Sequence, residues 1–258
     1  MRTPEIPVEE EPAVPPHGLL RSVVLHLLPG AALTAFVLAA APVVEELGLP
    51  ALFAFFVGIG LVIVPLELGY LAVTARRTTG SWSPLGAVGY RRRLRPRTYV
   101  LGGVALFLWF TVFSTASMLL LDEWIADNLF GWMPETLLQF SRVDDDAALS
   151  TAALLLVLAA AFTFNGVLGP IVEELYFRGH LLPRLSRLGR WAPVLNTVLF
   201  SVYHLWTPWT NPARIIGFLP ITWAVWRTRS VYLGVVAHVL INTVFLVLLT
   251  ALVLGGEA

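Results

Sequence analysis

The sequence predicts an all-α fold, a polytopic membrane bundle of about seven transmembrane helices. Apolar residues make up 57% of the 258 residues, and charged residues make up only 13%. That charged share is about half of the usual share in a soluble domain. The mean hydropathy of +0.76 supports the same prediction. These values exclude a soluble globular enzyme, a disordered chain and a nucleic-acid-binding protein with a basic face.

The chain is expected to consist of a short polar tail and one membrane domain. Residues 1–18 hold five prolines and four glutamates and predict a disordered cytosolic tail without signal-peptide features. Residues 19–254 predict a single transmembrane domain, because apolar stretches of spanning length follow one another. The fifth and sixth of these stretches are short. The predicted spans are 19–43, 51–74, 99–121, 149–172, 191–206, 212–227 and 231–254.

The charges of the loops alternate in sign along the predicted spans. The loop 75–98 contains seven Arg and no acid, whereas the loop 122–148 contains one Arg and seven acids. The turns 178–190 and 227–230 are again rich in Arg. Because positively charged loops stay in the cytosol, the N-terminus is expected in the cytosol and the C-terminus outside. We expect the bilayer concerned to be the cell (inner or plasma) membrane.

Two features concern the membrane interface. Segment 81–98 is expected either to rest its Arg residues on anionic head groups or to form a solvated cytosolic loop. Tryptophans near the ends of predicted spans are expected to form an interfacial belt. These tryptophans are Trp82, Trp124, Trp132, Trp191, Trp206, Trp209 and Trp226.

The residue types that are missing narrow the chemistry. The chain has no Cys, which excludes disulfides, a thiolate metal site and a cysteine nucleophile. All 17 basic residues are Arg, which excludes a Schiff-base lysine and a Ser–Lys dyad. Neither Gly-x-Ser-x-Gly nor His-Glu-x-x-His occurs. The use of Arg in place of Lys is typical of GC-rich bacterial genomes.

Several ionisable or amide side chains fall inside the predicted spans. An ionisable group at membrane depth costs on the order of 3 kcal/mol, so each one needs a partner or a function. The ionisable candidates are His26, Glu67, Glu173, Glu174, Arg178, His204 and His238, and the amides are Asn165, Asn196 and Asn242.

The densest cluster is Glu-Glu-Leu-Tyr-Phe-Arg, which begins at Glu173. Glu174 and Arg178 are four residues apart, so on a helix they share a face and can form an ion pair. Such a pair could serve only to hold the helix in place. Glu173 points about 100° away from Glu174, toward a different neighbour and without an obvious cation.

Two further pairs repeat the four-residue spacing. Phe200 and His204 form one pair, and His238 and Asn242 form the other. A carboxylate and an imidazole can hold and deprotonate a water, and a second imidazole with a carboxamide can donate to an oxyanion. Together with Glu173, these residues suffice to hydrolyse an amide without a covalent intermediate. A single imidazole in a span is equally compatible with an inter-helix hydrogen bond.

These motifs resemble those of the CAAX-protease and bacteriocin-processing (CPBP, or Abi) family of intramembrane glutamic endopeptidases. The sequence has Glu-Glu-Leu-Tyr-Phe-Arg-Gly at 173–179, Phe-x-x-x-His at 200–204 and His-x-x-x-Asn at 238–242, in the order of the family. The resemblance covers about residues 150–250, which it implies to be the catalytic core. Type II CAAX prenyl endopeptidases belong to the same family.

The resemblance implies a role for each motif residue. Glu173 and His204 would activate a water, and His238 and Asn242 would form the oxyanion site. The substrate would be a membrane-associated or lipidated protein or peptide, and no cofactor or metal would be required. The structural residues of the motifs would be Glu174, Arg178 and Phe200.

Three other functions use the same residues. Glu173, His204 and His238 could form a His₂Glu zinc site with an open fourth position. A transporter could use buried Glu and His to carry ions, although no repeated half with broken helices is evident. A non-catalytic immunity protein could keep the motifs without the activity.

Overall fold

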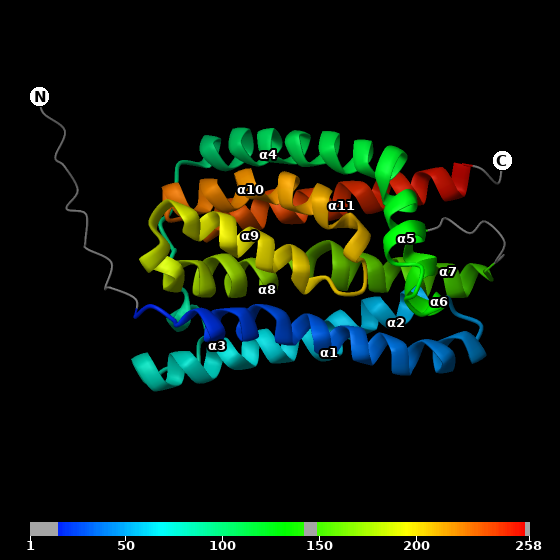
Figure 1. The fold of residues 1–258 in the computed structure, drawn as a ribbon, viewed down its shortest axis with the longest axis horizontal. Helices are drawn as coiled ribbons and strands as arrows, with labels where there is room; N and C mark the ends of the chain where they lie inside the picture. The colour runs from blue at the N-terminus through cyan, green and yellow to red at the C-terminus, as the bar shows by residue number, and fades with distance from the viewer. Residues whose placement is uncertain (1–14, 142–148, 256–258) are drawn as a thin grey trace, which may run out of the picture.

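The computed structural model describes residues 15–141 and 149–255, so most of the predicted tail 1–18 lies outside the described residues. Within the described part the chain is helical, and its only β pairing is the isolated bridge between Arg91 and Ser230. The predicted all-α membrane bundle is confirmed. Figure 1 shows the long helices packed side by side along one direction, with α5 standing across their ends.

Several of the long helical stretches consist of shorter α-helices joined by π-helical segments. The first half contains α1 (Leu19–Glu46), then α2 (Ala51–Gly58) and α3 (Val64–Thr79) joined by the π-helical segment Ile59–Ile63, then α4 (Pro96–Ser117) and α5 (Glu123–Leu129) joined by Met118–Asp122. The short α6 (Glu135–Leu138) follows. Short 3₁₀ turns occur at Pro84–Ala87, Gln139–Ser141 and Pro208–Thr210.

The second half holds the motif residues. A single run joins α7 (Thr151–Ala160), the π-helical segment Ala161–Leu168, α8 (Gly169–Glu173), the π-helical segment Glu174–Leu181 and the 3₁₀ segment Leu182–Trp191. At the end of this run, Gly189 has a φ of 50°, a conformation that costs little only for glycine, and the chain reverses there. The remaining helices are α9 (Ala192–Tyr203), α10 (Asn211–Thr228) and α11 (Val231–Gly255).

The number of spans agrees only approximately with the predicted seven. In the described part, five helical stretches are long and apolar enough to cross a membrane: Leu19–Glu46, Ala51–Thr79, Pro96–Leu129, Thr151–Tyr203 and Val231–Leu248. The fourth stretch merges the predicted fourth and fifth spans. The predicted fifth span is α9, with 12 residues, and the sixth is α10, with 18 residues. Both are short, as the sequence indicates.

The Arg-rich segments gather at one end of the bundle. The links from α3 to α4, from α8 to α9 and from α10 to α11 all lie at the left end in Figure 1, and the link from α1 to α2 lies at the other end with α5 and α6. This arrangement agrees with the alternation of loop charge. Arg142 and the acids Asp144, Asp145 and Asp146 lie outside the described residues. The direction of the bundle in the membrane stays a prediction.

Segment 81–98 is partly built into that end of the bundle. The backbone N–H of Gly89 donates to the carbonyl oxygen of Gly179 at 2.8 Å, and Val231 N–H donates to the carbonyl oxygen of Tyr90 at 2.8 Å. Val88 and Tyr90 are buried, whereas the three arginines 91–93 are exposed. The segment is therefore not a wholly solvated loop, and its Arg residues face outward.

The predicted tryptophan belt is wrong for two of its members. Trp206 and Trp209 are 5% and 1% exposed. The reason is that α9 ends at Tyr203, earlier than the predicted span, and the chain after it turns inside the protein. Trp209 packs there with Ala126 and Leu138 under α5 and α6. By contrast, Trp82, Trp124, Trp132 and Trp191 are at least 59% exposed.

The predicted orientation can be tested with single cysteines in this Cys-free chain. Ser83 and Asn128 are exposed; Ser83 lies in the link from α3 to α4 and Asn128 lies in α5, and Figure 1 shows this link and α5 at opposite ends of the bundle. We expect a membrane-impermeant maleimide to label Asn128→Cys in intact cells and Ser83→Cys only after the membrane is opened, because the Arg-rich end stays in the cytosol. Labelling of Ser83→Cys in intact cells would show that the orientation is reversed.

Candidate active site

Two π-helical segments shape the helix that carries Glu173. Helical turns of this kind interrupt the regular hydrogen-bond ladder and occur often at functional sites. A side-chain amide reaches a backbone carbonyl in each segment. Asn242 of α11 donates to the carbonyl oxygen of Asn165 at 2.8 Å, and Asn196 of α9 donates to the carbonyl oxygen of Phe177 at 3.0 Å. Asn196 and Asn242 thus make contacts between helices through their side-chain amides, and Asn165 does so through its backbone carbonyl.

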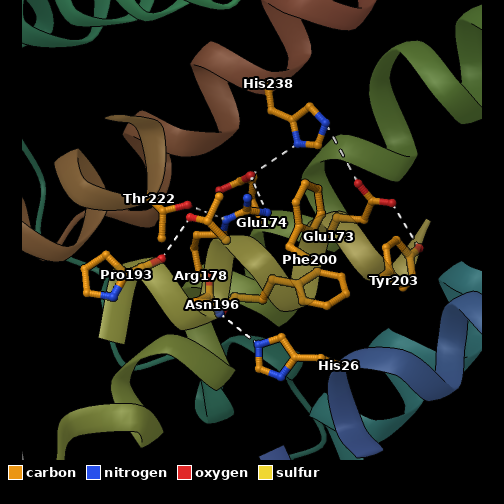
Figure 2. Close-up of polar contacts among 12 residues, drawn as sticks. His26, Glu173, Glu174, Arg178, Pro193, Asn196, Phe200, Tyr203, Thr222 and His238 are labelled. Atoms are coloured by element: carbon orange, nitrogen blue, oxygen red, sulfur yellow. Dashed lines mark hydrogen bonds and ion pairs between the residues drawn. The ribbon is translucent and has the colours of Figure 1, made fainter. Parts of the chain in front are cut away.

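Glu174 and Arg178 form the predicted ion pair. Arg178 Nη1 lies 3.2 Å from Glu174 Oε1, and both side chains are 0% exposed. The guanidinium carbon is 3.7 Å from the centre of the Phe200 ring, and Nε donates to Thr222 Oγ1 at 3.4 Å. Figure 2 shows the pair enclosed by side chains from several helices. Through its contacts with Phe200 of α9 and Thr222 of α10, the buried pair links these two helices to the Glu-Glu motif.

His238 connects the two glutamates. Its Nδ1 lies 3.2 Å from Glu174 Oε1, and its Nε2 lies 3.9 Å from Glu173 Oε2 (Figure 2). Gly234, one turn earlier on α11, allows this approach, because a Cβ there would lie 2.3 Å from Glu174 Oε2. The glycine lets the carboxylate of Glu174 come close to α11.

Glu173 has different neighbours from Glu174, as its position in the sequence predicts. The hydroxyl of Tyr203 donates to Glu173 Oε1 at 3.0 Å (Figure 2). The Glu173 side chain is 12% exposed, whereas that of Glu174 is 0% exposed. The structure shows no Arg ion pair at Glu173 within the described residues. Glu173 is therefore the glutamate of the motif that a water molecule can reach.

His204 has a defined orientation just beyond the end of α9. Its Nδ1 lies 2.8 Å from the carbonyl oxygen of Phe200. A carbonyl oxygen only accepts hydrogen bonds, so Nδ1 carries the proton. In the neutral ring Nε2 is then an acceptor. The four-residue spacing of Phe200 and His204 thus fixes the imidazole through the backbone.

The four predicted catalytic residues line one cavity of about 250 Å³: Glu173, His204, His238 and Asn242. Apolar side chains from α1, α2, α4, α10 and α11 form much of the remaining wall. Phe245 of α11 also lines the cavity and is 55% exposed, so the cavity reaches the outer surface of the bundle beside α11.

Two predicted intramembrane groups lie outside the cavity wall. His26 contacts the carbonyl oxygen of Ser22 through Nδ1 at 2.6 Å and Asn196 through Nε2 at 3.0 Å. Glu67 on α3 is 0% exposed, and neither carboxyl oxygen has a hydrogen-bond partner among the described residues. His26 thus has the inter-helix role that is common for a single intramembrane imidazole.

Two polar residues of the candidate site were not predicted from the sequence. Tyr203 immediately precedes His204 and holds Glu173. Arg214 lines the cavity from the first turn of α10. Arg214 could have been predicted from the sequence, because an Arg within the predicted span 212–227 is as costly in a membrane as the buried Glu residues.

The described residues do not contain a group of three or more His, Asp or Glu side chains placed to hold a metal ion. In this geometry Glu173, His204 and His238 share a cavity without forming a three-ligand set. The zinc alternative therefore has no support from the arrangement of these side chains.

The comparisons with known proteins concern the same part of the chain. Residues 151–244 match the family model described as type II CAAX prenyl endopeptidase Rce1-like. No curated protein and no solved structure matches the chain. The matched region extends from α7 into α11 and contains all three motifs and the four predicted catalytic residues. Over this region, which is less than half of the chain, the sequence is similar to the Rce1-like type II CAAX prenyl endopeptidases.

Proposed function

We propose that the protein is an intramembrane endopeptidase of the glutamic type, in which Glu173 and His204 activate a water molecule. The observation that carries this proposal is that a carboxylate, two imidazoles and a carboxamide from three segments of the chain line one cavity. The catalytic core would be residues 150–250. The substrate would be a membrane-associated or lipidated protein or peptide, reached through the opening beside Phe245.

Glu173 and His204 have complementary properties for holding the water. The Glu173 carboxylate accepts the Tyr203 hydroxyl through Oε1, which leaves lone pairs of the carboxylate for a water proton. The bond from His204 Nδ1 to the Phe200 carbonyl fixes Nε2 as a second acceptor. A water that donates its protons to both groups keeps its oxygen lone pairs free to attack the carbonyl carbon of a peptide bond.

His238 and Asn242 would stabilise the oxyanion. His238 Nδ1 lies 3.2 Å from Glu174 Oε1, whereas Nε2 is 3.9 Å from Glu173 Oε2 and so beyond hydrogen-bond distance, which leaves an Nε2 proton available for the oxyanion. Asn242 uses one N–H on the Asn165 carbonyl and keeps the second for another acceptor.

The reaction conserves protons within the site. The water oxygen attacks the peptide carbonyl carbon while Glu173 takes one water proton. The carbonyl oxygen becomes an anion that His238 and Asn242 bind. When the C–N bond breaks, the proton on Glu173 passes to the leaving nitrogen while the second water proton stays on the new carboxyl group, so the products are a carboxylic acid and an amine, and Glu173 is again a carboxylate. We expect this to take place in the cell (inner or plasma) membrane.

The function can be tested by comparing the termini of membrane proteins in cells that carry the wild-type protein or Glu173→Gln. New termini that appear only with the wild-type protein would identify substrates and cleavage sites. Identical termini in the two samples would argue for a non-catalytic protein.

Glu173→Gln and His204→Ala should each abolish cleavage while the protein still folds. The glutamine keeps an acceptor for Tyr203 but cannot take a proton, so we expect a loss of about 10²–10⁴-fold in rate. The measurement is single-turnover cleavage by purified protein, with circular dichroism to check folding. Full activity in either variant would remove that residue from the water-activating pair.

Glu174→Gln is the matched control for Glu173→Gln, because it makes the same change one residue away. It leaves the buried Arg178 without its charge partner, which costs about 3–5 kcal/mol of stability. We therefore expect a lower yield and melting temperature for Glu174→Gln. Equal melting temperatures for the two variants would contradict the different roles of the two glutamates.

Asn242→Ala separates an oxyanion donor from a simple helix contact. Loss of a donor that acts in the transition state costs roughly 3 kcal/mol, or about 100-fold in kcat, with little change in KM. An inter-helix hydrogen bond alone is worth about 1 kcal/mol in a bilayer and would lower only the melting temperature. Both quantities are measured on one Asn242→Ala sample. A destabilised variant with normal turnover would exclude Asn242 from catalysis.

A chelation experiment distinguishes the glutamic mechanism from the zinc alternative. Activation by Glu173 and His204 needs no ion, so we expect activity to survive a strong chelator and the purified protein to contain substoichiometric metal. Stoichiometric zinc, with activity lost on chelation and restored by zinc, would establish the His₂Glu mechanism instead.

A further inference from the structure

Arg214 is a cation in the wall of the candidate active site. It lines the same cavity as Glu173 and His204 and projects from the first turn of α10. An arginine inside the predicted span 212–227 is costly, and such residues mark substrate or ion pathways when they face a water-filled cavity. The roles proposed above for the four predicted catalytic residues do not use this charge.

Uncharged groups hold the guanidinium in place. Nη1 donates to Asn211 Oδ1 at 3.0 Å and to the carbonyl oxygen of Ser201 at 3.5 Å, and Nη2 donates to Thr207 Oγ1 at 3.0 Å. All three acceptors lie at the turn between α9 and α10 or at its edge. They orient Arg214 without neutralising it, and they leave N–H groups of its five donors available.

The charge of Arg214 has no ion-pair partner in the described part of the chain. The buried ion pairs there join Arg178 with Glu174 and His238 with the two glutamates. Glu173 and Asp122 attract the guanidinium electrostatically, but neither forms an ion pair with it, and Asp122 instead accepts the Ser117 hydroxyl at 2.6 Å. Arg178, by contrast, is enclosed and forms an ion pair with Glu174 at 3.2 Å.

We propose that Arg214 binds a carboxylate of the substrate inside the cavity and so selects peptides that carry a free carboxyl group close to the cleaved bond. A guanidinium binds carboxylates in a forked, charge-assisted geometry, and it does so more strongly where water is excluded. The carboxylate can be the C-terminal group of the peptide or an acidic side chain. The proposal deepens the proposed function and rests on the same cavity.

The test measures binding separately from cleavage. Full-length protein carrying Glu173→Gln is titrated in detergent micelles by calorimetry with three peptides. The first is acetyl-Ala-Val-Ile-Leu as the free acid, the second is its C-terminal amide, and the third is the amide with Asp in place of Ile. We expect the free acid to bind on the order of 10- to 100-fold more tightly than the amide, as for a hydrogen bond to a charged group.

Variants at Arg214 in the same background assign that preference. Arg214→Gln should bind the acid and the amide equally, with little change for the amide, and Arg214→Lys should keep part of the preference. The matched control is Arg227→Gln, which changes an exposed Arg on the same helix outside the cavity and should keep the full preference. A purely structural role for Arg214 would instead weaken the binding of both peptides alike.

The outcomes are distinct. If the Asp-containing amide binds as tightly as the free acid, the site accepts a side-chain carboxylate. If only the free acid binds tightly, the site binds the C-terminal carboxylate specifically. Equal affinities for acid and amide in the parent, or no binding of any peptide at millimolar concentration, overturn the proposal even if the Arg214 variants do not fold. A preference retained in Arg214→Gln overturns it as well. A preference for the acid without any cleavage by wild-type protein would instead contradict the hydrolytic function and leave the carboxylate site standing.

Discussion

The buried ion pair between Glu174 and Arg178 is the interaction on which the site depends. Neither side chain touches solvent, and removal of either partner would leave an uncompensated charge inside the bundle. The pair also organises its neighbours, since Arg178 lies against the Phe200 ring of α9 and donates to Thr222 of α10, while Glu174 accepts His238 of α11. Three helices that are far apart in sequence are thus positioned by one electrostatic contact. A hydrophobic replacement could give equal stability, but it could not orient His238.

The π-helical segments extend this organisation along the helix that carries both glutamates. A regular α-helix satisfies its own carbonyls, whereas here side chains from other helices reach the carbonyls of Asn165 and Phe177. In a bilayer, an unsatisfied carbonyl is costly, so these amides are constrained to remain in place. Asn242 is therefore held at the cavity by the backbone of the helix that presents Glu173. Its position depends on the local helix geometry as well as on its own helix.

The motif residues could be predicted from the sequence because their chemistry is unusual in an apolar chain. The sequence predicts the catalytic residues from the free-energy cost of polar groups in a membrane and from their four-residue spacing. These residues, which line one cavity, are Glu173, His204, His238 and Asn242. The early end of α9 could not be predicted, since the apolar pattern continues through the turn, and so Trp206 and Trp209 were placed at the interface instead of the interior. Tyr203 carries no charge and has no distinctive spacing, so its bond to Glu173 depends on the tertiary structure. The π-helical segments likewise leave no signal in hydropathy.

Two adjacent glutamates acquire different properties because their surroundings differ. Glu174 is 0% exposed, and its Oε1 lies beside both the Arg178 guanidinium and His238 Nδ1. Glu173 receives a hydrogen bond from a neutral tyrosine and faces a cavity, with His238 Nε2 at 3.9 Å. A carboxylate that must take up and release a proton needs the second environment, since a tight ion pair would hold it permanently charged. The 100° rotation between consecutive helical residues is what separates the two environments. In the proposed mechanism, the consecutive Glu-Glu pair therefore allows one short segment to supply both the partner of Arg178 and a base, with His238 close to both.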